Sequence, residues 1–218
     1  MKIACVGYRD WSLKIYKKLQ NNTEHQFLMQ LSKQDFSETK IEKFHPDFIL
    51  FYGWSDIVPS SLIGKFKCLM LHPSSLPKYR GGSPIQNQII RGEEHSAVSI
   101  FLMDDGIDTG PIAKQAYLSL AGSIEEIFER IEISGYKLTK EILTTGANFV
   151  KQNHEQATYF ERRKPHESEV TMEELQSKSA EYLKNKIRML QGPYPKPYIT
   201  AADGFRLYIH EVSLSGKE

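Results

Sequence analysis

The sequence predicts an open α/β fold: a mostly parallel, Rossmann-like sheet with helices on both faces, followed by a small appendage of a helix and a β-hairpin. Short apolar runs at residues 2–7, 48–52 and 68–71 are separated by segments whose apolar residues recur at helical spacing. Strands that are apolar throughout are typical of a sheet covered on both faces. At 218 residues the chain can bury one full-sized core and a short addition. We therefore divide it into a main domain, residues 1–150, and residues 151–218, which hold a linker, a helix and a small β appendage.

The first part of the chain alternates strands with helices. After the strand at residues 2–7, Trp11, Ile15 and Leu19 fall on one face of a helix. The same reasoning predicts strands at 25–31, 48–52 and 68–71, and helices at 38–44 and 59–65. A strand, a turn and a helix repeated in this way build a parallel sheet.

The middle of the chain completes the sheet. Residues 83–91 form a helix that we expect Ser83 to cap, with Pro84 at its first position. Residues 97–103 and 112–120 form two strands of a hairpin. A long helix then follows a capping serine, and it carries acidic residues in its first turn and a buried stripe at helical spacing: Ser123, Glu125, Glu126, Ile127, Ile131, Leu138 and Ile142.

The composition changes after residue 150. Residues 152–168 are polar and predict an ordered linker that crosses the surface, and residues 171–190 have helical spacing again. Residues 198–214 alternate in a way that suits two short strands turning at Asp203-Gly204. This last part is the predicted appendage.

Charge and cysteine content limit the function classes. A net charge of +1 gives no reason to expect nucleic acid or a membrane surface as the main partner. Cys5 and Cys68 lie inside apolar runs, so we expect buried thiols and neither a disulfide nor a metal site. No run approaches the ~18 consecutive apolar residues of a membrane span, and residues 1–9 do not resemble a signal peptide. We expect a soluble, cytoplasmic protein.

Two loops carry the side chains that indicate chemistry. His72 follows the apolar run 68–71 and opens a loop rich in glycine and proline, and Asp108 lies in a second such loop after residues 98–103. An imidazole near a carboxylate suits proton transfer near neutral pH, because the carboxylate stabilises the imidazolium and orients the ring. In an open α/β sheet, ligands bind at the carboxyl ends of the strands, where both residues fall. The sequence therefore predicts an active site here.

The sequence offers three other interpretations. Gly7 follows the first strand, but the spaced glycines of a dinucleotide-binding turn are missing. Residues 108–110 spell the Asp-Thr-Gly triplet of aspartic proteases, which needs a second triplet or a dimer of small β-barrels, and the helical first half of the chain opposes that. Taken alone, His72 also suits a structural histidine, and only its loop and its pairing with Asp108 favour catalysis.

The two loops together resemble the formyltransferases that use N10-formyltetrahydrofolate. The resemblance rests on residues 71–81, LHPSSLPKYRG, and residues 103–110, MDDGIDTG, and on the interval of 36 residues between His72 and Asp108. Residues 51–59 resemble the folate loop of that family, and residues 159–165 resemble the segment after its catalytic domain. The resemblance covers nearly the whole chain and implies that residues 1–150 are a formyltransferase catalytic domain.

The resemblance also implies roles for individual residues. His72 corresponds to the general base for the attacking amine, and Asp108 to its carboxylate partner. The formyl donor N10-formyltetrahydrofolate, which leaves as tetrahydrofolate, would bind between two loops at Trp54, Ser55, Asp56, Ile57, Asp104, Asp105 and Ile107. The acceptor would bind at Arg9, Ser75, Lys78, Tyr79, Arg80, Gly81, Gly82, Arg162 and Arg163. The arginines and lysine among these suit a diphosphate.

One residue departs from the family pattern. The family has asparagine two positions before the histidine, and this chain has Met70. An asparagine amide can donate to the formyl oxygen as negative charge develops on it, whereas a thioether cannot, and loss of such a donor typically costs roughly 10²–10³ in rate. Another donor therefore substitutes, or the chain is a silent relative that binds folate or a nucleotide sugar without turnover.

The acceptor is the remaining question. Recognition of transfer RNA would favour a larger C-terminal domain and a basic surface, neither of which this sequence shows. We therefore expect formyl transfer to a nucleotide-linked amino sugar, giving a formamido sugar, and the enzymes of bacterial surface-sugar pathways, including the pseudaminic acid type, resemble the chain most. Methionyl-tRNA or another amine is the alternative acceptor. The expected partner is a small-molecule substrate, and a homodimer is left open.

Overall fold

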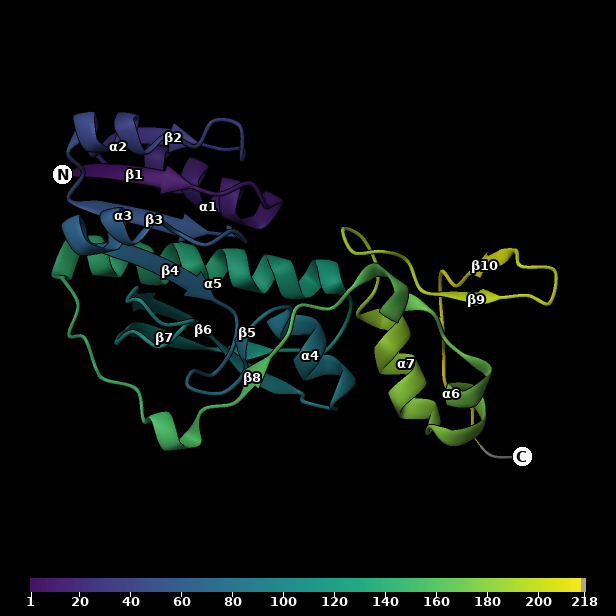
Figure 1. The fold of residues 1–218 in the computed structure, drawn as a ribbon. Coiled ribbons are helices and arrows are strands. Elements are labelled where there is room, and N and C mark those ends of the chain that lie inside the picture. Colours follow the sequence, from purple (N-terminus) through teal and green to yellow (C-terminus); the bar gives the residue numbers. More distant parts are fainter. Residues whose placement is uncertain (217–218) are drawn as a thin grey trace.

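The central sheet has six strands in the order β2–β1–β3–β4–β6–β7 (Figure 1). The computed structural model describes residues 1–216. The strands are β1 (Lys2–Val6), β2 (Gln26–Gln30), β3 (Phe48–Tyr52), β4 (Cys68–His72), β6 (His95–Leu102) and β7 (Ile112–Ser119). The first four pair in parallel, while β6 is antiparallel to both β4 and β7. The predicted mostly parallel α/β sheet and its terminal hairpin are confirmed.

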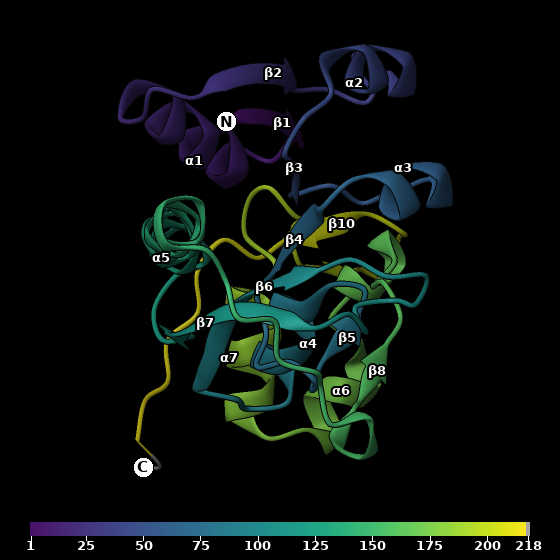
Figure 2. The ribbon, with the colours of Figure 1, turned by 90° about the vertical axis from the view of Figure 1, so that its left-hand side faces the viewer.

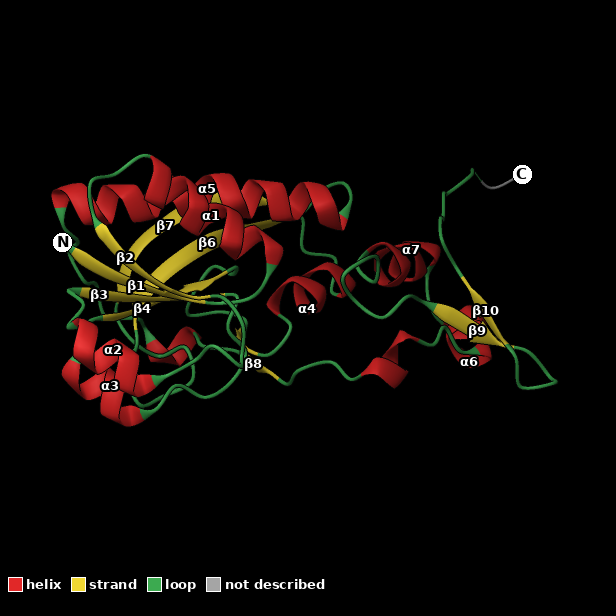
Figure 3. Ribbon diagram, turned by 90° about the horizontal axis from the view of Figure 1, so that it is seen from above, coloured by secondary structure: helices red, strands yellow, loops and turns green. Residues whose placement is uncertain are grey.

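Helices cover both faces of this sheet (Figure 3). On one face lie α1 (Asp10–Asn21) and α5 (Ile124–Thr145), and on the other lie α2 (Glu38–Phe44) and α3 (Ser60–Lys65). Side chains alternate along each strand, so β1 contributes to two cores: Ile3 and Cys5 pack beneath α1 and α5, and Ala4 and Val6 pack on the side of α2 and α3. This two-sided burial explains why the strands are apolar throughout.

The two predicted serine caps differ in the structure. Ser123 begins α5 with a full capping box, because its hydroxyl accepts from the Glu126 amide while the Glu126 carboxylate accepts from the Ser123 amide. Ser83 precedes α4 (Pro84–Ile90) in a left-handed conformation and its side chain does not cap the helix. Its hydroxyl instead accepts from the backbone amide of Arg163 at 3.1 Å. The prediction of a Ser83 side-chain cap was wrong, because a distant segment takes that oxygen.

The appendage contains two helices where the sequence predicted one. They are α6 (Met172–Ser177) and α7 (Ala180–Arg188). The chain is extended at Ser179, whose hydroxyl accepts from the Tyr182 amide and so starts a new helix. After them β9 (Tyr198–Thr200) and β10 (Arg206–Tyr208) pair as the predicted antiparallel hairpin. Figure 1 shows the appendage beside one end of the main domain, and in Figure 2, seen from the opposite end, it lies behind that domain.

The segment predicted as a linker adds a strand pairing to the main domain. Within it, β8 (Tyr159–Phe160) pairs in parallel with β5 (Arg80–Gly81), between short 3₁₀ turns at His154–Gln156 and Pro165–Ser168. Figure 1 shows this segment running along the lower edge of the domain from the end of α5. It thereby joins the loop that follows His72.

The cysteines are buried and unpaired, as predicted. Burial raises the pKa of the Cys5 thiol and raises that of Cys68 to about 12, so both are inert near neutral pH. Within residues 1–216, no helix has the length and apolar character needed to cross a bilayer, and no group of three or more metal-ligating side chains gathers.

Candidate active site

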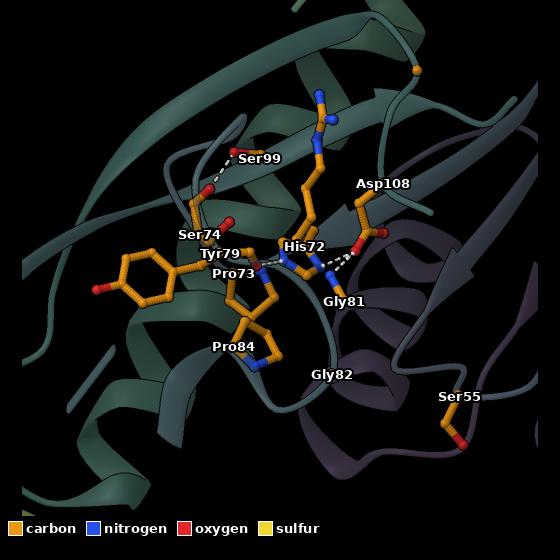
Figure 4. A network of polar contacts seen from close by, with 12 residues as sticks. Ser55, His72, Pro73, Ser74, Tyr79, Gly81, Gly82, Pro84, Ser99 and Asp108 are labelled. Atoms are coloured by element: carbon orange, nitrogen blue, oxygen red, sulfur yellow. Dashed lines mark hydrogen bonds and ion pairs between the residues drawn. The ribbon is translucent and has the colours of Figure 1, made fainter. Parts of the chain in front are cut away.

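His72 ends β4 with both ring nitrogens facing polar groups (Figure 4). Its Nε2 lies 2.8 Å from the carbonyl oxygen of Tyr79, and its Nδ1 lies 3.4 Å from Asp108 Oδ2. A carbonyl oxygen only accepts, so Nε2 carries the hydrogen and donates it. In the neutral ring Nδ1 is therefore the nitrogen that can take up a proton, and it faces a carboxylate.

Asp108 is fixed in the loop after β6. Its backbone is left-handed, with φ of 54°, and its Oδ2 accepts from the Gly81 amide at 2.8 Å. The side chains of His72 and Asp108 are only 7% and 9% exposed, which strengthens the interaction between them relative to one in water. The structure thus brings together the two residues that the sequence paired, in the arrangement needed to stabilise an imidazolium.

A buried arginine supports the His72–Asp108 pair through Gln152. Arg80 is fully buried, and its guanidinium donates to Gln152 Oε1 at 3.2 and 2.6 Å and to the Tyr159 hydroxyl at 2.6 Å. Gln152 in turn donates to the carbonyl oxygens of Asp108 and Gly110, at 3.0 and 2.6 Å. Arg80 therefore holds the Asp108 loop, and its prediction as a substrate contact was wrong. No sequence motif pointed to Gln152.

One cleft of about 2120 Å³ opens beside His72 and Asp108. It gathers most of the other predicted site residues: Arg9, Trp54, Ser55, Asp56, Ile57, Gly81, Gly82, Asp104, Asp105, Ile107, Arg162 and Arg163. Met70 also lines it, as does Gln86 of α4, which sequence reasoning missed. The loops predicted for the donor thus share one cleft with His72 and Asp108.

Three further predicted substrate residues lie outside this cleft. Ser75 and Lys78 are exposed on the loop between β4 and β5, but they do not line the cleft. Tyr79 is turned away (Figure 4): its hydroxyl donates to Glu93 at 2.8 Å and its ring stacks on Phe160 at 4.9 Å. Desolvation by burial, with the Glu93 carboxylate, raises the pKa of Tyr79 to about 12. The structure thus does not bring these three residues to the cleft: Ser75 and Lys78 are exposed elsewhere on the loop, and Tyr79 is held by Glu93 and Phe160.

The loop after β3 forms the opposite side of the cleft. Gly53 has a left-handed backbone, and a Cβ there would lie 2.7 Å from the Arg9 side chain. Trp54 packs against Tyr8 and Phe36, and its Nε1 is buried with no hydrogen-bond partner within residues 1–216. The next residues reach solvent, and the Ile57 side chain is 97% exposed. Ile57 therefore presents apolar surface that nothing else within residues 1–216 covers.

Comparison with known proteins identifies the family. A model of the formyl transferase domain matches residues 15–146. The chain belongs to the formyltransferase family. Members of this family take the formyl group from N10-formyltetrahydrofolate.

Individual relatives extend this finding. Methionyl-tRNA formyltransferase from Hydrogenobaculum sp. is 32% identical over 187 residues, which are 81% of this chain and 59% of that protein. The structure of methionyl-tRNA formyltransferase from Clostridium thermocellum has a TM-score of 0.89 at 32% identity, covering 99% of this chain and 94% of the other. A likely sugar N-formyltransferase from Mycobacterium tuberculosis shares the fold, with a TM-score of 0.81 at 18% identity over 100% and 99% of the two chains. The chain spans about three fifths of the length of the first curated relatives.

The cleft suits the formyl donor of this family. A folate combines a flat heteroaromatic ring, which packs on apolar surface, with amino groups that donate hydrogen bonds. The cleft offers both kinds of surface: an apolar wall that includes Val58, Ile63 and Met103, and the carboxylates of Asp104 and Asp105 on the loop that carries Asp108. These groups would hold the donor beside His72.

Met70 is the departure from the formyltransferase pattern, and the structure shows its surroundings. It lies on β4 two residues before His72, so the two side chains project from the same face of the strand, and it pairs in register with Phe51. Both Met70 and His72 line the cleft. Met70 therefore stands beside His72 in the cleft without a hydrogen-bond donor, and Gln86 is a side-chain amide lining the same cleft.

Proposed function

We propose that this protein transfers the formyl group of N10-formyltetrahydrofolate to the amine of a nucleotide-linked amino sugar, giving a formamido sugar. The observation that carries the transfer is the His72–Asp108 pair at 3.4 Å, which lines a cleft of about 2120 Å³. Ordinary ligand pockets measure about 300–1,000 Å³, so this cleft has room for a donor and an acceptor together.

His72 acts as the base in this proposal. When bound, the donor supplies an electrophilic formyl carbon to the attacking amine. His72 Nδ1 takes the proton that the amine loses and can return it to the nitrogen from which the formyl group departs, while Nε2 keeps its own hydrogen and donates it to the Tyr79 carbonyl. Asp108 then faces a cationic ring and stabilises it, and the Gly81 amide keeps the carboxylate oriented. Base catalysis of this kind contributes roughly 10²–10⁴ in rate.

The charges around the cleft favour a small acceptor over a transfer RNA. Ten acidic side chains line it against five basic ones. Two of those cations, Lys14 and Lys18, are paired with Glu132. A polyanion as long as transfer RNA needs many unpaired cations, whereas a single diphosphate needs only a few, and Arg162 and Arg163 stand together at one side.

Methionyl-tRNA is the second candidate acceptor. The observation that favours it is the 32% identity to the Clostridium thermocellum methionyl-tRNA formyltransferase over nearly the whole of both structures. A silent relative that binds these ligands without turnover is the third candidate, favoured by Met70 alone.

One assay separates the three candidates. Purified protein with N10-formyltetrahydrofolate is offered a panel of UDP- and dTDP-linked amino sugars and, separately, methionyl-tRNA, and formylated products are measured by mass spectrometry. We expect a product from at least one amino-sugar nucleotide and none from methionyl-tRNA. Transfer to methionyl-tRNA alone would overturn the proposed acceptor, and binding of all ligands without any product would establish the silent relative.

A further inference from the structure

A second, smaller hollow of about 410 Å³ lies beside the cleft, between the end of α4 and residues 160–167. Residues 160–163 line both hollows, so they form the wall between them. Two hydrogen bonds connect that wall to Asp108. The Gly82 amide donates to the Phe160 carbonyl at 2.8 Å, and the amide of the preceding residue, Gly81, donates to Asp108. A ligand that occupies the cleft near His72 can therefore continue across a single stretch of chain.

The hollow carries an excess of positive charge. Four permanent cations line it: Arg91, Arg162, Arg163 and Lys164. Only Glu161 and Glu167 oppose them, and His166 adds a fifth basic group. Within residues 1–216, Arg91, Arg162 and Lys164 form no ion pair, while Arg163 lies 3.6 Å from Glu167. Unpaired cations that share a hollow attract an anion from solution.

Two of these cations are held in place. Arg91 donates from one nitrogen to the carbonyl and side-chain oxygens of Asn87, at 3.0 and 3.1 Å, and its guanidinium lies 4.1 Å from the centre of the Phe160 ring. Arg163 donates to the Glu167 carbonyl at 2.8 Å, and its Nε is buried with no hydrogen-bond partner in the described part of the chain. Side chains fixed in this way lose little entropy when they bind a phosphate, and guanidinium groups suit phosphate oxygens.

We propose that this hollow binds the diphosphate of the acceptor, with the amino sugar extending over residues 160–163 toward His72. The inference rests on the proposed nucleotide-linked acceptor and adds to it the place where the anionic part binds. It also gives roles to Arg91 and Lys164, which were not among the predicted site residues, and leaves Lys78 without one.

A binding experiment tests the hollow without any turnover. Inorganic pyrophosphate, UDP and dTDP are titrated calorimetrically into the full-length protein and into the variants Arg91→Gln, Lys164→Gln and Lys140→Gln. Lys140 is an exposed cation on α5 that lines neither hollow, so it is the matched control. We expect Arg91→Gln and Lys164→Gln each to raise the Kd by about three- to tenfold, and the control to leave it unchanged. Lys164 is exposed, so its variant keeps the test valid even if Arg91→Gln fails to fold.

Kinetics separate failure of the hollow from failure of the proposed function. The KM for the amino-sugar nucleotide should rise in both variants, while the KM for N10-formyltetrahydrofolate stays constant. Transfer to amino-sugar nucleotides with an unchanged KM in both variants would overturn the diphosphate site alone. Equal pyrophosphate binding by all four proteins would overturn it as well. If only methionyl-tRNA is formylated, and its binding weakens in the variants, the hollow binds RNA phosphate and the diphosphate proposal is wrong.

Discussion

The two sides of the cleft differ in how completely their polar groups are bonded. On the His72 side, both ring nitrogens, the Asp108 carboxylate and the amide of Gly81 all face a partner, and Arg80 and Gln152 support them from behind. On the side of the loop after β3, the Trp54 nitrogen has no partner within residues 1–216 and Ile57 is almost fully exposed.

This difference separates chemistry from binding. A group that moves a proton must be oriented before the substrate arrives, because reorganisation during the reaction adds to the barrier. A surface that binds a flat ring can remain open until the ring covers it. We infer that the His72 side is preorganised for reaction, and that the opposite loop completes its contacts only with ligand.

Replacing His72 should have the largest effect, since it removes the base from the preorganised side. We expect His72→Ala to lower the single-turnover rate of formyl transfer by about 10³-fold at saturating donor, with little change in donor affinity. Rapid-quench kinetics measures the rate. His210→Ala, which changes an exposed histidine of the appendage, is the control. A rate near that of the unmodified protein would remove His72 from the mechanism.

Asp108→Asn should have the next largest effect. The amide keeps the shape of the side chain and can still accept from Gly81, but it no longer stabilises a cationic ring. We expect the rate to fall by about 10²-fold while the protein remains folded, as judged by circular dichroism. If the rate is unchanged, the carboxylate 3.4 Å from His72 only supports the loop.

A substitution at Met70 tests whether the His72 side of the cleft lacks a hydrogen-bond donor for the formyl oxygen. Met70→Asn would add an amide donor beside His72, and because Met70 is only partly buried and lines the cleft, the smaller side chain should cost little in packing. We expect the turnover rate to rise by about tenfold with little change in either KM. Met70→Leu is the control without a donor. An unchanged or reduced rate in the asparagine variant would show that another group already donates to the formyl oxygen. Gln86, whose side-chain amide lines the cleft, is the first candidate.

Gln152 gives the smallest expected effect and separates positioning from stability. Gln152→Leu removes the acceptor of the Arg80 guanidinium and both donors to the Asp108 loop, so it should lower the free energy of unfolding by about 1–3 kcal/mol and the rate severalfold. Gln152→Glu keeps the acceptor but loses the donors. We expect it to restore stability in urea titrations without restoring kcat. Full recovery of kcat would make Gln152 purely structural.

The sequence predicted the fold well where burial alone determines an element. The apolar runs located each strand of the sheet, and the acidic residues after Ser123 located a cap, because both signals are local. The break between α6 and α7 was missed, since the apolar spacing continues across it and only Ser179 marks the new start.

Predictions within the site failed where a side chain's direction depends on a distant partner. The motif of residues 71–81 correctly placed Arg80 near His72 in the chain. Its side chain, however, points away from the cleft and donates to Gln152, which lies 72 residues further along the sequence. Ser83 was expected to cap a helix and instead accepts from Arg163, 80 residues away. Such long-range contacts determine which cations face the cleft. The sequence therefore could not show that Arg162 lines the cleft and that Lys78 does not.

The pairing of β8 with β5 has a consequence for dissecting the protein by truncation. A shortened chain that stops at residue 150 would keep every strand of the central sheet, yet it would lose the neighbour of Arg80–Gly81 and the glutamine that anchors the Asp108 loop. It would also expose the guanidinium of Arg80, which is fully buried in the intact protein. The tertiary fold and the active site therefore have different boundaries along the chain, and limited proteolysis between residues 150 and 165 should abolish formyl transfer while the sheet persists.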